Sequence, residues 1–473
     1  PARNRSTMEQ TTETLRMGWL SAAIWVPIIS GIIVLSLGNE QRATLSRWLA
    51  LLGSLVGFAV TIPLYTGFDR TTAALQFVER KPWIESLGIE YSLGIDCLSV
   101  WLVLLTAFIT FVVVIAGWEV IKDRVHQYLG AFLILSGLMI GVFSAADGML
   151  FYVFFEATLI PMYIIIGVWG GPNRVYAAFK FFLYTLLGSL LTMVAIIYLY
   201  LQSGSFEILA WHRLPLTLHE QVLIFVAFLL AFAVKIPMWP VHTWLPDTAA
   251  VARPGTSVLL VGVLDKIGTF GMIALCLQLT PGAAASAKWV MCVLAVISIL
   301  WGGLAANGQN DIMRLVSYTS VSHFGFMVLG IFIGSQIALV GAMFYMVAHG
   351  VSIAAMFLLS GWLSRRGGTQ DMREYVGMQR VTPVLAGLWL VSGLASIALP
   401  GLSGFVPEYL VLMGTWTVSG PLALFAVLGV VIAALYVLMP YQRVFTGAPG
   451  KGKEELADLN GRERGVMVPL VAA

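Results

Sequence analysis

Long apolar segments separated by short polar connections make up most of the 473-residue chain. A bilayer core about 30 Å thick requires roughly 20 apolar residues for one helical crossing. Segments of that length occur thirteen times, and a fourteenth begins at Val466, so we expect the natural protein to continue beyond Ala473. The predicted spans are 18–37, 47–66, 95–117, 127–145, 148–168, 176–202, 221–245, 255–279, 287–306, 313–333, 336–363, 382–417 and 420–443.

This pattern predicts an all-α polytopic membrane protein with 14 transmembrane helices. Outer-membrane barrels instead show segments of about ten residues with alternating polarity. Apolar residues make up 59% of the chain and charged residues only 11%, against roughly 25% charged residues in a soluble domain. The composition therefore excludes a soluble domain, a disordered chain and a secreted disulfide scaffold. The net charge of +3 is too small for nucleic-acid binding.

The chain has three cysteines, Cys97, Cys276 and Cys292, and none belongs to a C-x-x-C pair. Iron–sulfur clusters and cysteine-based zinc sites require closely spaced thiolates. We therefore expect no such centre in this chain and interpret the three thiols as buried and inert.

Lysine and arginine are distributed unevenly between the two sides of the predicted bundle. Connections that follow odd-numbered spans hold 16 of them, and the opposite side, including the N-terminus, holds 8. Because basic loops stay in the cytoplasm, we expect the N-terminus to face outward. Residues 67–94 then form the largest outer loop. The segment 19–37 is too long for a signal-peptide core and is interpreted as a retained first span.

Two predicted spans contain helix-breaking residues. The seventh contains Pro237 and Pro240, and the twelfth contains Pro400 and Gly404. Broken helices at corresponding places in two halves are typical of inverted repeats with a transport site between them. The predicted organisation is 1–126 (spans 1–3), 127–280 (first five-helix repeat, spans 4–8), 281–445 (second inverted repeat, spans 9–13) and 446–473 (inner loop and start of span 14).

Several predicted spans carry ionisable side chains. Such groups are costly inside a membrane and are functional candidates by default. A mixed series of acids and bases suits the stepwise transfer of protons, because histidine in particular gains and loses a proton near neutral pH. The candidates are Glu156, Lys235, Asp265, Lys266, His323, His349 and Glu408.

Static roles remain open for these candidates. Glu156 and Lys235 can form a structural ion pair between two helices. His323 and His349 can be hydrogen-bonded between helices without transferring protons. Glu408 can pair with a lysine of a neighbouring subunit and hold the two subunits together.

Other polar residues fit surface roles better. Lys180 lies one turn inside the sixth span, and its long side chain can reach the membrane surface. His242, within WPVHTWLP, suits an aromatic belt at the interface. His126, His212 and His219 lie in loops and receive no role.

Five segments resemble the antiporter-like, proton-pumping subunits of respiratory complex I, and most of all the M type of bacterial NADH–quinone oxidoreductase, which is similar to mitochondrial subunit 4. The resemblance covers about residues 90–445. The segments are FYVFFEATLIPMYIIIGVWGG (151–171), FVAFLLAFAVKIPMWPVHTWLPD (225–247), RLVSYTSVSHFGFMVLGIF (314–332), MVAHGVSIAAMFLLSG (346–361) and GLSGFVPEYLVL (401–412).

The resemblance implies a proton-transfer role for six of the candidates. It places Glu156 in span 5 and Lys235 on the broken span 7. Because each charge would otherwise be uncompensated in lipid, we expect the two side chains to lie within ion-pair distance or one water apart. It makes Lys266 the central lysine of span 8 and Glu408 the terminal proton acceptor on broken span 12. We expect Lys266 to be the pivot between the repeats, with the two histidines nearby in a wet cavity, and Glu408 to contact water admitted by the break in its helix. The six residues are Glu156, Lys235, Lys266, His323, His349 and Glu408.

The sequence departs from the family in one place. Relatives usually read D-A-H-x-E-A-P and later L-L-K, where this chain reads DTAAVARPGTSVLLVGVLDK. The loop gains Arg253, and Asp265 replaces an apolar residue directly before Lys266. Adjacent residues on a helix point in different directions. We therefore expect Asp265 to face away from Lys266, towards another polar partner or water.

The resemblance implies a subunit of a proton-translocating NADH:quinone oxidoreductase in the bacterial inner membrane. It implies no cofactor, redox centre or metal in this chain, with flavin, iron–sulfur clusters and quinone in partner subunits. The expected partners are homologous antiporter-like subunits, other membrane subunits of the complex and lipids. An Mrp-type Na+/H+ antiporter subunit, a membrane hydrogenase subunit and a purely structural membrane scaffold remain alternatives.

Overall fold

The computed structural model describes residues 18–473 and is dominated by helices. The polar segment 1–17, part of the predicted N-terminal region, lies outside the described residues. The described chain divides into two compact units. The first unit comprises residues 18–114, 121–162 and 192–215, and the second comprises 115–120, 163–191 and 216–473.

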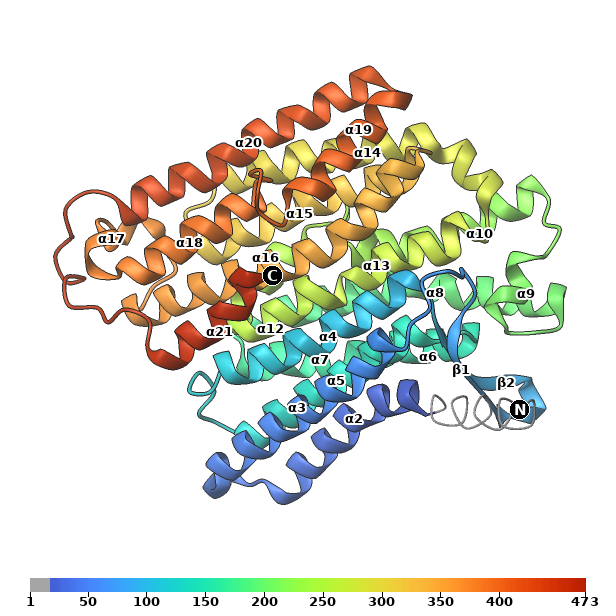
Figure 1. Cartoon of the computed structure of the whole chain (residues 1–473), viewed down its shortest axis with the longest axis horizontal. Coiled ribbons are helices and arrows are strands. Elements are labelled where there is room, and N and C mark those ends of the chain that lie inside the picture. The colour runs from blue at the N-terminus through green and yellow to red at the C-terminus, as the bar shows by residue number, and fades with distance from the viewer. Residues whose placement is uncertain (1–17) are drawn as a thin grey trace, which may run out of the picture. The chain divides into compact units, whose positions relative to one another are not determined.

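The first unit contains a helical bundle and one β-hairpin (Figure 1). Its elements are α2 (Trp19–Leu37), η1 (Glu40–Arg42), α3 (Ala43–Thr66), β1 (Gln76–Ile84), η2 (Glu85–Leu87), β2 (Ile89–Ile95), most of α4 (Cys97–Ala116), α5 (Val125–Ser144), α6 (Gly148–Ala157), the start of α7 (Leu159–Trp169), the end of α8 (Arg174–Ser203) and α9 (Ile208–His212).

Helices α2, α3 and α5 pack side by side in this unit (Figure 1). The contact between α2 and α5 depends on small residues. A Cβ atom at Gly31 would lie 2.6 Å from the carbonyl oxygen of Gly130, and one at Gly137 would lie 2.5 Å from that of Ile24. Glycine at these positions therefore allows two membrane helices to approach at backbone distance.

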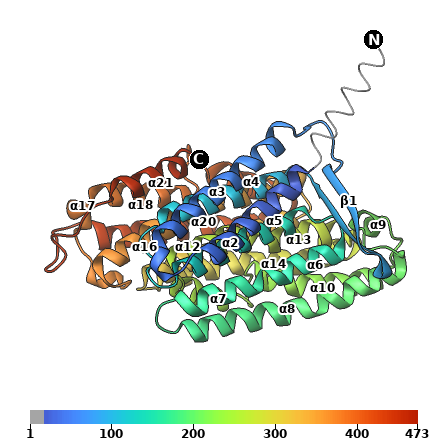
Figure 2. The same cartoon turned by 90° about the horizontal axis from the view of Figure 1, so that it is seen from below.

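Strands β1 and β2 form an antiparallel hairpin that occupies most of the predicted outer loop 67–94 and ends at Ile95, a region for which no strand was predicted. Figure 2 shows the hairpin at one end of the first unit. The carboxylate of Glu79 accepts hydrogen bonds from the backbone N–H and the hydroxyl of Ser21, at 2.8 and 2.7 Å. These bonds fix the hairpin to the start of α2.

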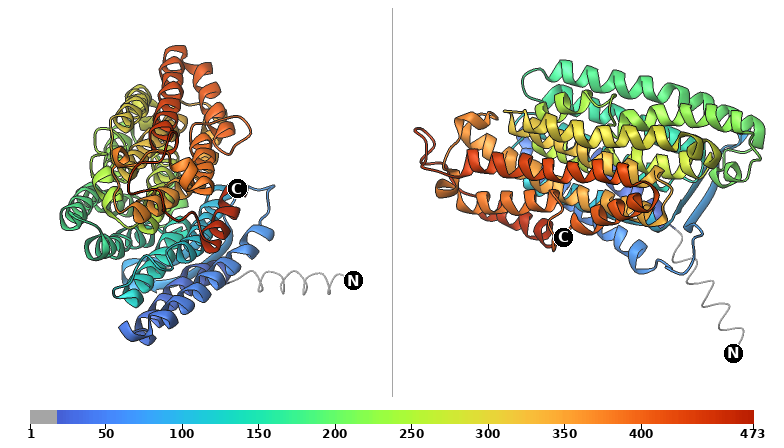
Figure 3. Two further views of the ribbon diagram at one scale, coloured as in Figure 1. Left: turned by 90° about the vertical axis from the view of Figure 1, so that its left-hand side faces the viewer. Right: turned by 90° about the horizontal axis from the view of Figure 1, so that it is seen from above.

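The second unit contains the remaining helices (Figure 3). Its elements include α10 (Leu218–Lys235), α11 (Trp244–Val251), α12 (Pro254–Leu259), η3 (Leu260–Leu264), α13 (Lys266–Gly271), η4 (Met272–Leu277), α14 (Pro281–Asn307), α15 (Ile312–Phe332), α16 (Gln336–Gly367), η5 (Met372–Glu374), α17 (Met378–Val381), α18 (Pro383–Ser396), α19 (Phe405–Val418), α20 (Gly420–Phe445) and α21 (Gly461–Ala472). Within this unit, α15 packs against α14 and α16, α16 packs against α19, and α20 packs against α14.

Residues 18–473 contain 12 helical segments that are long and apolar enough to cross a membrane. The prediction of a helical membrane protein is therefore confirmed. The predicted span 382–417 consists of two shorter helices, α18 and α19. The predicted total of 14 spans stays a prediction.

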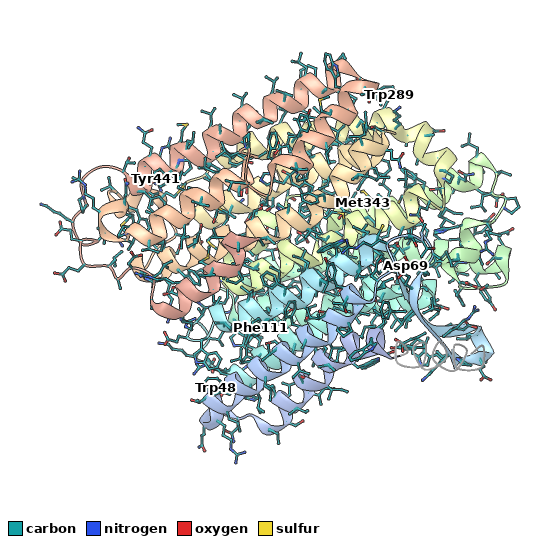
Figure 4. All side chains as sticks on the ribbon, in the orientation of Figure 1. Trp48, Asp69, Phe111, Trp289, Met343 and Tyr441 are labelled. Carbon is teal, nitrogen blue, oxygen red and sulfur yellow. The ribbon has the colours of Figure 1, made fainter. Side chains whose placement is uncertain are left out.

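Both units expose large apolar side chains, as expected for surfaces in contact with lipid or neighbouring subunits. Trp48 on α3 and Trp289 on α14, marked in Figure 4, are 58% and 53% exposed. The three cysteines differ in burial. Cys276 and Cys292 are buried as predicted, whereas Cys97 is exposed because it opens α4 at the end of the hairpin.

Candidate functional site

The predicted break in the seventh span is present between α10 and α11. Pro237 has no N–H to donate, and the N–H of Met238 donates to the carbonyl of Ala233 at 2.9 Å. The indole of Trp244 donates to the carbonyl of Val234 at 2.8 Å. The side chain of a nearby tryptophan thus satisfies a backbone group that the interruption releases, as a low-dielectric environment requires.

Lys235 is the last residue of α10 and is 2% exposed. Its charge interacts with Asp265 of the neighbouring span. The break thus places a buried amine at a helix end, beside the segment that carries Lys266.

The segment Pro254–Leu277 is not a uniform α-helix. Two π-helical stretches, η3 and η4, flank the short α13, which begins at Lys266. π-Helical turns are frequent at functional sites because they change the direction of neighbouring side chains. Here they bracket the residue that was predicted to be the pivot of the site.

Lys266 is fully buried. Its Nζ donates to the carbonyl of Val261 at 3.0 Å and lies 2.7 Å from Nδ1 of His349 on α16. The ammonium also lies 4.7 Å from the centre of the Phe324 ring, a favourable cation–π arrangement. Lys266 therefore faces the interior of the second unit and not lipid.

The two histidines continue from this lysine across α15 and α16. The ring centres of His349 and His323 are 5.4 Å apart. Nε2 of His349 lies 3.2 Å from the hydroxyl of Ser320. His323 bonds two tyrosine hydroxyls, with Nδ1 2.7 Å from Tyr345 and Nε2 3.3 Å from Tyr436. The structure thus places both histidines near Lys266, as predicted.

Glu408 lies in the first turn of α19 and is buried. Its carboxylate interacts with the side chain of Tyr345, whose hydroxyl forms a hydrogen bond with His323. One of its carboxylate oxygens has no hydrogen-bond partner among residues 18–473. The second unit therefore contains a nearly continuous series of polar side chains that extends from Lys266 to Glu408.

The predicted break before Glu408 is also present, between Ser396 and Phe405. Turn hydrogen bonds satisfy part of its backbone, for example from the N–H of Leu399 to the carbonyl of Leu394 at 3.1 Å. A side chain at Gly404 would collide with the carbonyl of Ala395. The expected contact of Glu408 with water stays a prediction.

Glu156 belongs to the first unit, near the end of α6, and is partly exposed. The predicted fifth span is divided there into α6 and α7. Pro161 offers no N–H to the carbonyl of Ala157, which accounts for the interruption. The pairing of Glu156 with Lys235 stays a prediction.

A charged cluster in the second unit was not predicted. Asp247 accepts from Lys180 and from Arg314, each at 2.6 Å, and so links α8, α11 and α15. The ammonium of Lys180 is held by this carboxylate, and its expected extension to the membrane surface stays a prediction. The signal was available, since Asp247 ends the quoted segment 225–247.

Two further residues have more specific contacts than the sequence indicated. His242, expected in an interface belt, is buried and accepts a hydrogen bond from the indole of Trp301 at 3.1 Å. Arg253, in the segment that departs from the family, donates to the carbonyl of Trp169 at 2.7 Å and so caps the end of α7.

The fold and the site define a helical membrane protein with breaks between α10 and α11 and between α18 and α19, and with a buried Lys–His–Tyr–Glu series. Family models match most of the chain. Residues 145–433 match the model described as NADH:quinone oxidoreductase/Mrp antiporter, TM, and residues 44–144 match NADH-ubiquinone oxidoreductase chain 4, amino terminus. The chain belongs to this family of NADH:quinone oxidoreductase and Mrp antiporter membrane proteins.

Similar proteins match this chain along almost its whole length. NADH-quinone oxidoreductase subunit M of Rhodobacter capsulatus is 40% identical over 472 residues, which cover 96% of this chain and 91% of the relative. Subunit M of Mycobacterium tuberculosis (strain ATCC 25618 / H37Rv) is 39% identical over 495 residues, which cover 96% of this chain and 89% of the relative.

Solved structures share the fold. A chain of respiratory complex I from Thermus thermophilus with bound NADH matches with a TM-score of 0.88 and 32% identity, covering 96% of this chain and 94% of that chain. A chain of the Mrp complex from Dietzia sp. DQ12-45-1b matches with a TM-score of 0.79 and 22% identity, covering 92% and 82%. The second likeness shows the fold alone.

Proposed function

We propose that the chain is the proton-translocating M-type membrane subunit of an NADH–quinone oxidoreductase. The observation that carries this proposal is the buried series Lys266–His349–His323–Tyr345–Glu408. A purely structural scaffold gains nothing from burying these groups, because each is costly in a membrane. The similarity to subunit M relatives at 39–40% identity supports the assignment to this complex.

Transfer along the series begins at the central lysine. The ammonium of Lys266 gives a proton to Nδ1 of neutral His349, which leaves a neutral amine and an imidazolium. His323, whose ring centre lies 5.4 Å from that of His349, next accepts a proton by way of the hydroxyl of Ser320, which lies 3.2 Å from Nε2 of His349. Tyr345 forms a hydrogen bond with His323 and interacts with Glu408, so it can relay the proton by exchanging its hydroxyl hydrogen.

The proposal extends to the two remaining predicted residues. Glu156 and Lys235 act as the first half of the path, and Glu408 acts at the end of the second half. The two interrupted helices support two inverted five-helix repeats, 127–280 and 281–445. Opposite charges at the two breaks, a base at 235 and an acid at 408, suit entry near the first break and exit near the second.

Electron transfer takes place outside this chain in the proposal. Flavin, iron–sulfur clusters and quinone belong to partner subunits, and homologous antiporter-like subunits are the membrane neighbours. The exposed apolar side chains suit such neighbours and lipid. The complex lies in the bacterial inner membrane, and the N-terminus faces outward, as the distribution of basic residues indicates.

The test uses the whole complex reconstituted in vesicles, with NADH oxidation and interior acidification measured together. Lys266→Ala is the test variant, and Cys276→Ser, a buried change in the same span, is the matched control. The proposal expects an assembled Lys266→Ala complex to lose most NADH-driven proton transport and the control to keep it. Normal transport in Lys266→Ala would contradict the proposal.

The Mrp-type antiporter is the second candidate, because the fold is shared with the Mrp complex. A membrane hydrogenase subunit is a third. Proteins that copurify with the chain separate the three. Quinone oxidoreductase subunits support the first proposal, Mrp subunits with Na+-dependent transport support the second, and hydrogenase subunits support the third.

A further inference from the structure

Asp265 is a buried carboxylate for which the proposed path has no role. It is fully buried, and neither of its oxygens has a hydrogen-bond partner among residues 18–473. An uncompensated charge in such a place is strongly unfavourable. Its position therefore requires an explanation from the charges around it.

The side of the helix that carries Asp265 faces α10. Gly268 lies three residues later and so on the same face. A Cβ atom at Gly268 would lie 2.8 Å from the carbonyl oxygen of Phe232 and 3.0 Å from the backbone nitrogen of Ile236. Because these residues flank Lys235, the face of Asp265 is the one that packs on the end of α10.

Lys266 leaves the same segment in another direction, towards His349 on α16. Gly262, four residues earlier, also faces α16, since a Cβ atom there would lie 3.5 Å from the carbonyl oxygen of Gly350. The segment thus separates two buried lysines, with Lys235 beyond one face and Lys266 on the other. Asp265 interacts electrostatically with both.

We propose that Asp265 is an additional proton-transfer residue that connects Lys235 to Lys266. This inference rests on the proposed proton translocation. In the first step the Lys235 ammonium loses a proton to the Asp265 carboxylate, which gives a neutral amine and a carboxylic acid. In the second step the carboxylic acid returns a proton to the neutral amine of Lys266, which becomes an ammonium.

A single carboxylate suits this place because it balances either lysine in turn. With one lysine protonated and Asp265 ionised, the trio carries no net charge. After transfer to Asp265 both amines and the carboxylic acid are neutral, so the trio is again uncharged. The proton thus passes between the lysines without a net charge that the buried site would have to stabilise.

The test measures NADH-driven proton transport and NADH oxidation in the reconstituted whole complex. Asp265→Asn keeps shape and polarity but cannot accept the proton. Asp265→Leu replaces the carboxylate with an apolar side chain and tests the role if the Asn variant does not assemble. Asp265→Glu keeps the carboxylate, and Cys276→Ser is the control in the same span.

Proton-transfer groups commonly contribute about 100-fold or more to a reaction rate. We therefore expect Asp265→Asn and Asp265→Leu to lower the proton-transport rate at least about tenfold in assembled complexes. Asp265→Glu should keep most of the wild-type transport rate, which a purely packing role of Asp265 does not predict. Normal proton transport in Asp265→Asn or Asp265→Leu would overturn the inference. So would an Asp265→Glu complex that is as impaired as Asp265→Asn. Normal transport in Lys266→Ala would instead contradict the proposed function itself.

Discussion

Nζ of Lys266 lies 2.7 Å from Nδ1 of His349, on a different helix of the same unit. This distance is that of a short hydrogen bond between two groups that both exchange protons. The remaining acceptor of Lys266 is the carbonyl of Val261, which cannot take its proton. Any transfer from this lysine towards α15 and α16 therefore begins at His349.

The first prediction concerns that contact. His349→Ala should lower proton transport at least about tenfold, because Lys266 loses its proton acceptor. Ser352→Ala, one turn further along α16, is the control and should leave transport unchanged. The measurement is NADH-driven acidification of vesicles at equal complex content. Equal rates in the two variants would place His349 outside the path.

The second prediction compares two tyrosines on opposite sides of His323. Tyr345→Phe removes the hydroxyl that lies 2.7 Å from Nδ1 of His323 and interacts with Glu408, whereas Tyr436→Phe removes one that lies 3.3 Å from Nε2 of His323. Tyr345→Phe should therefore slow proton transport several-fold more than Tyr436→Phe. The same vesicle assay ranks them, and the reverse order would show that protons do not pass through Tyr345.

The third prediction concerns stability. Asp247→Asn weakens two ion pairs, and hydrogen bonds to charged groups are each worth about 2 kcal/mol. We expect a lower melting temperature of the purified complex. Arg373→Ala, which removes an exposed ion pair with Asp371, is the control and should change stability little. Equal melting temperatures for Asp247→Asn and wild type would refute the structural role.

The fourth prediction uses two glycines of the same span. Gly268→Ala inserts a methyl group against the backbone of Phe232 and Ile236, and overpacking of this kind costs about 1–3 kcal/mol. Gly262→Ala meets its nearest atom at 3.5 Å, an ordinary contact. Only the first variant should lower the melting temperature or the yield of assembled complex. A lower melting temperature or yield in both variants would mean that this span packs differently from the arrangement described above.

Much of this fold could be predicted, because long apolar segments of the sequence indicate where membrane helices form. The broken helices were also predictable from Pro237 and Pro400. The hairpin was not, since β1 (QFVERKPWI) contains three consecutive charged residues and a proline, and its placement depends on contacts such as Glu79 with Ser21.

The ionisable part of the site was predicted because charges stand out in apolar spans. Its hydroxyl groups were not. Tyr345 and Tyr436 lie in apolar segments where a tyrosine resembles any other aromatic residue, and only the packing of α15, α16 and α20 brings them to His323. The π-helical turns around Lys266 likewise have no simple sequence signal.

The central claim is that protons travel along the buried series to Glu408. The most direct test is the number of protons transported per NADH oxidised in reconstituted complexes with Glu408→Gln and Glu408→Asp, each shown to be assembled. The account predicts that the Gln variant transports markedly fewer protons per NADH and that the Asp variant, which keeps a proton acceptor, transports more than the Gln variant. A Gln variant that matches the wild type would contradict it.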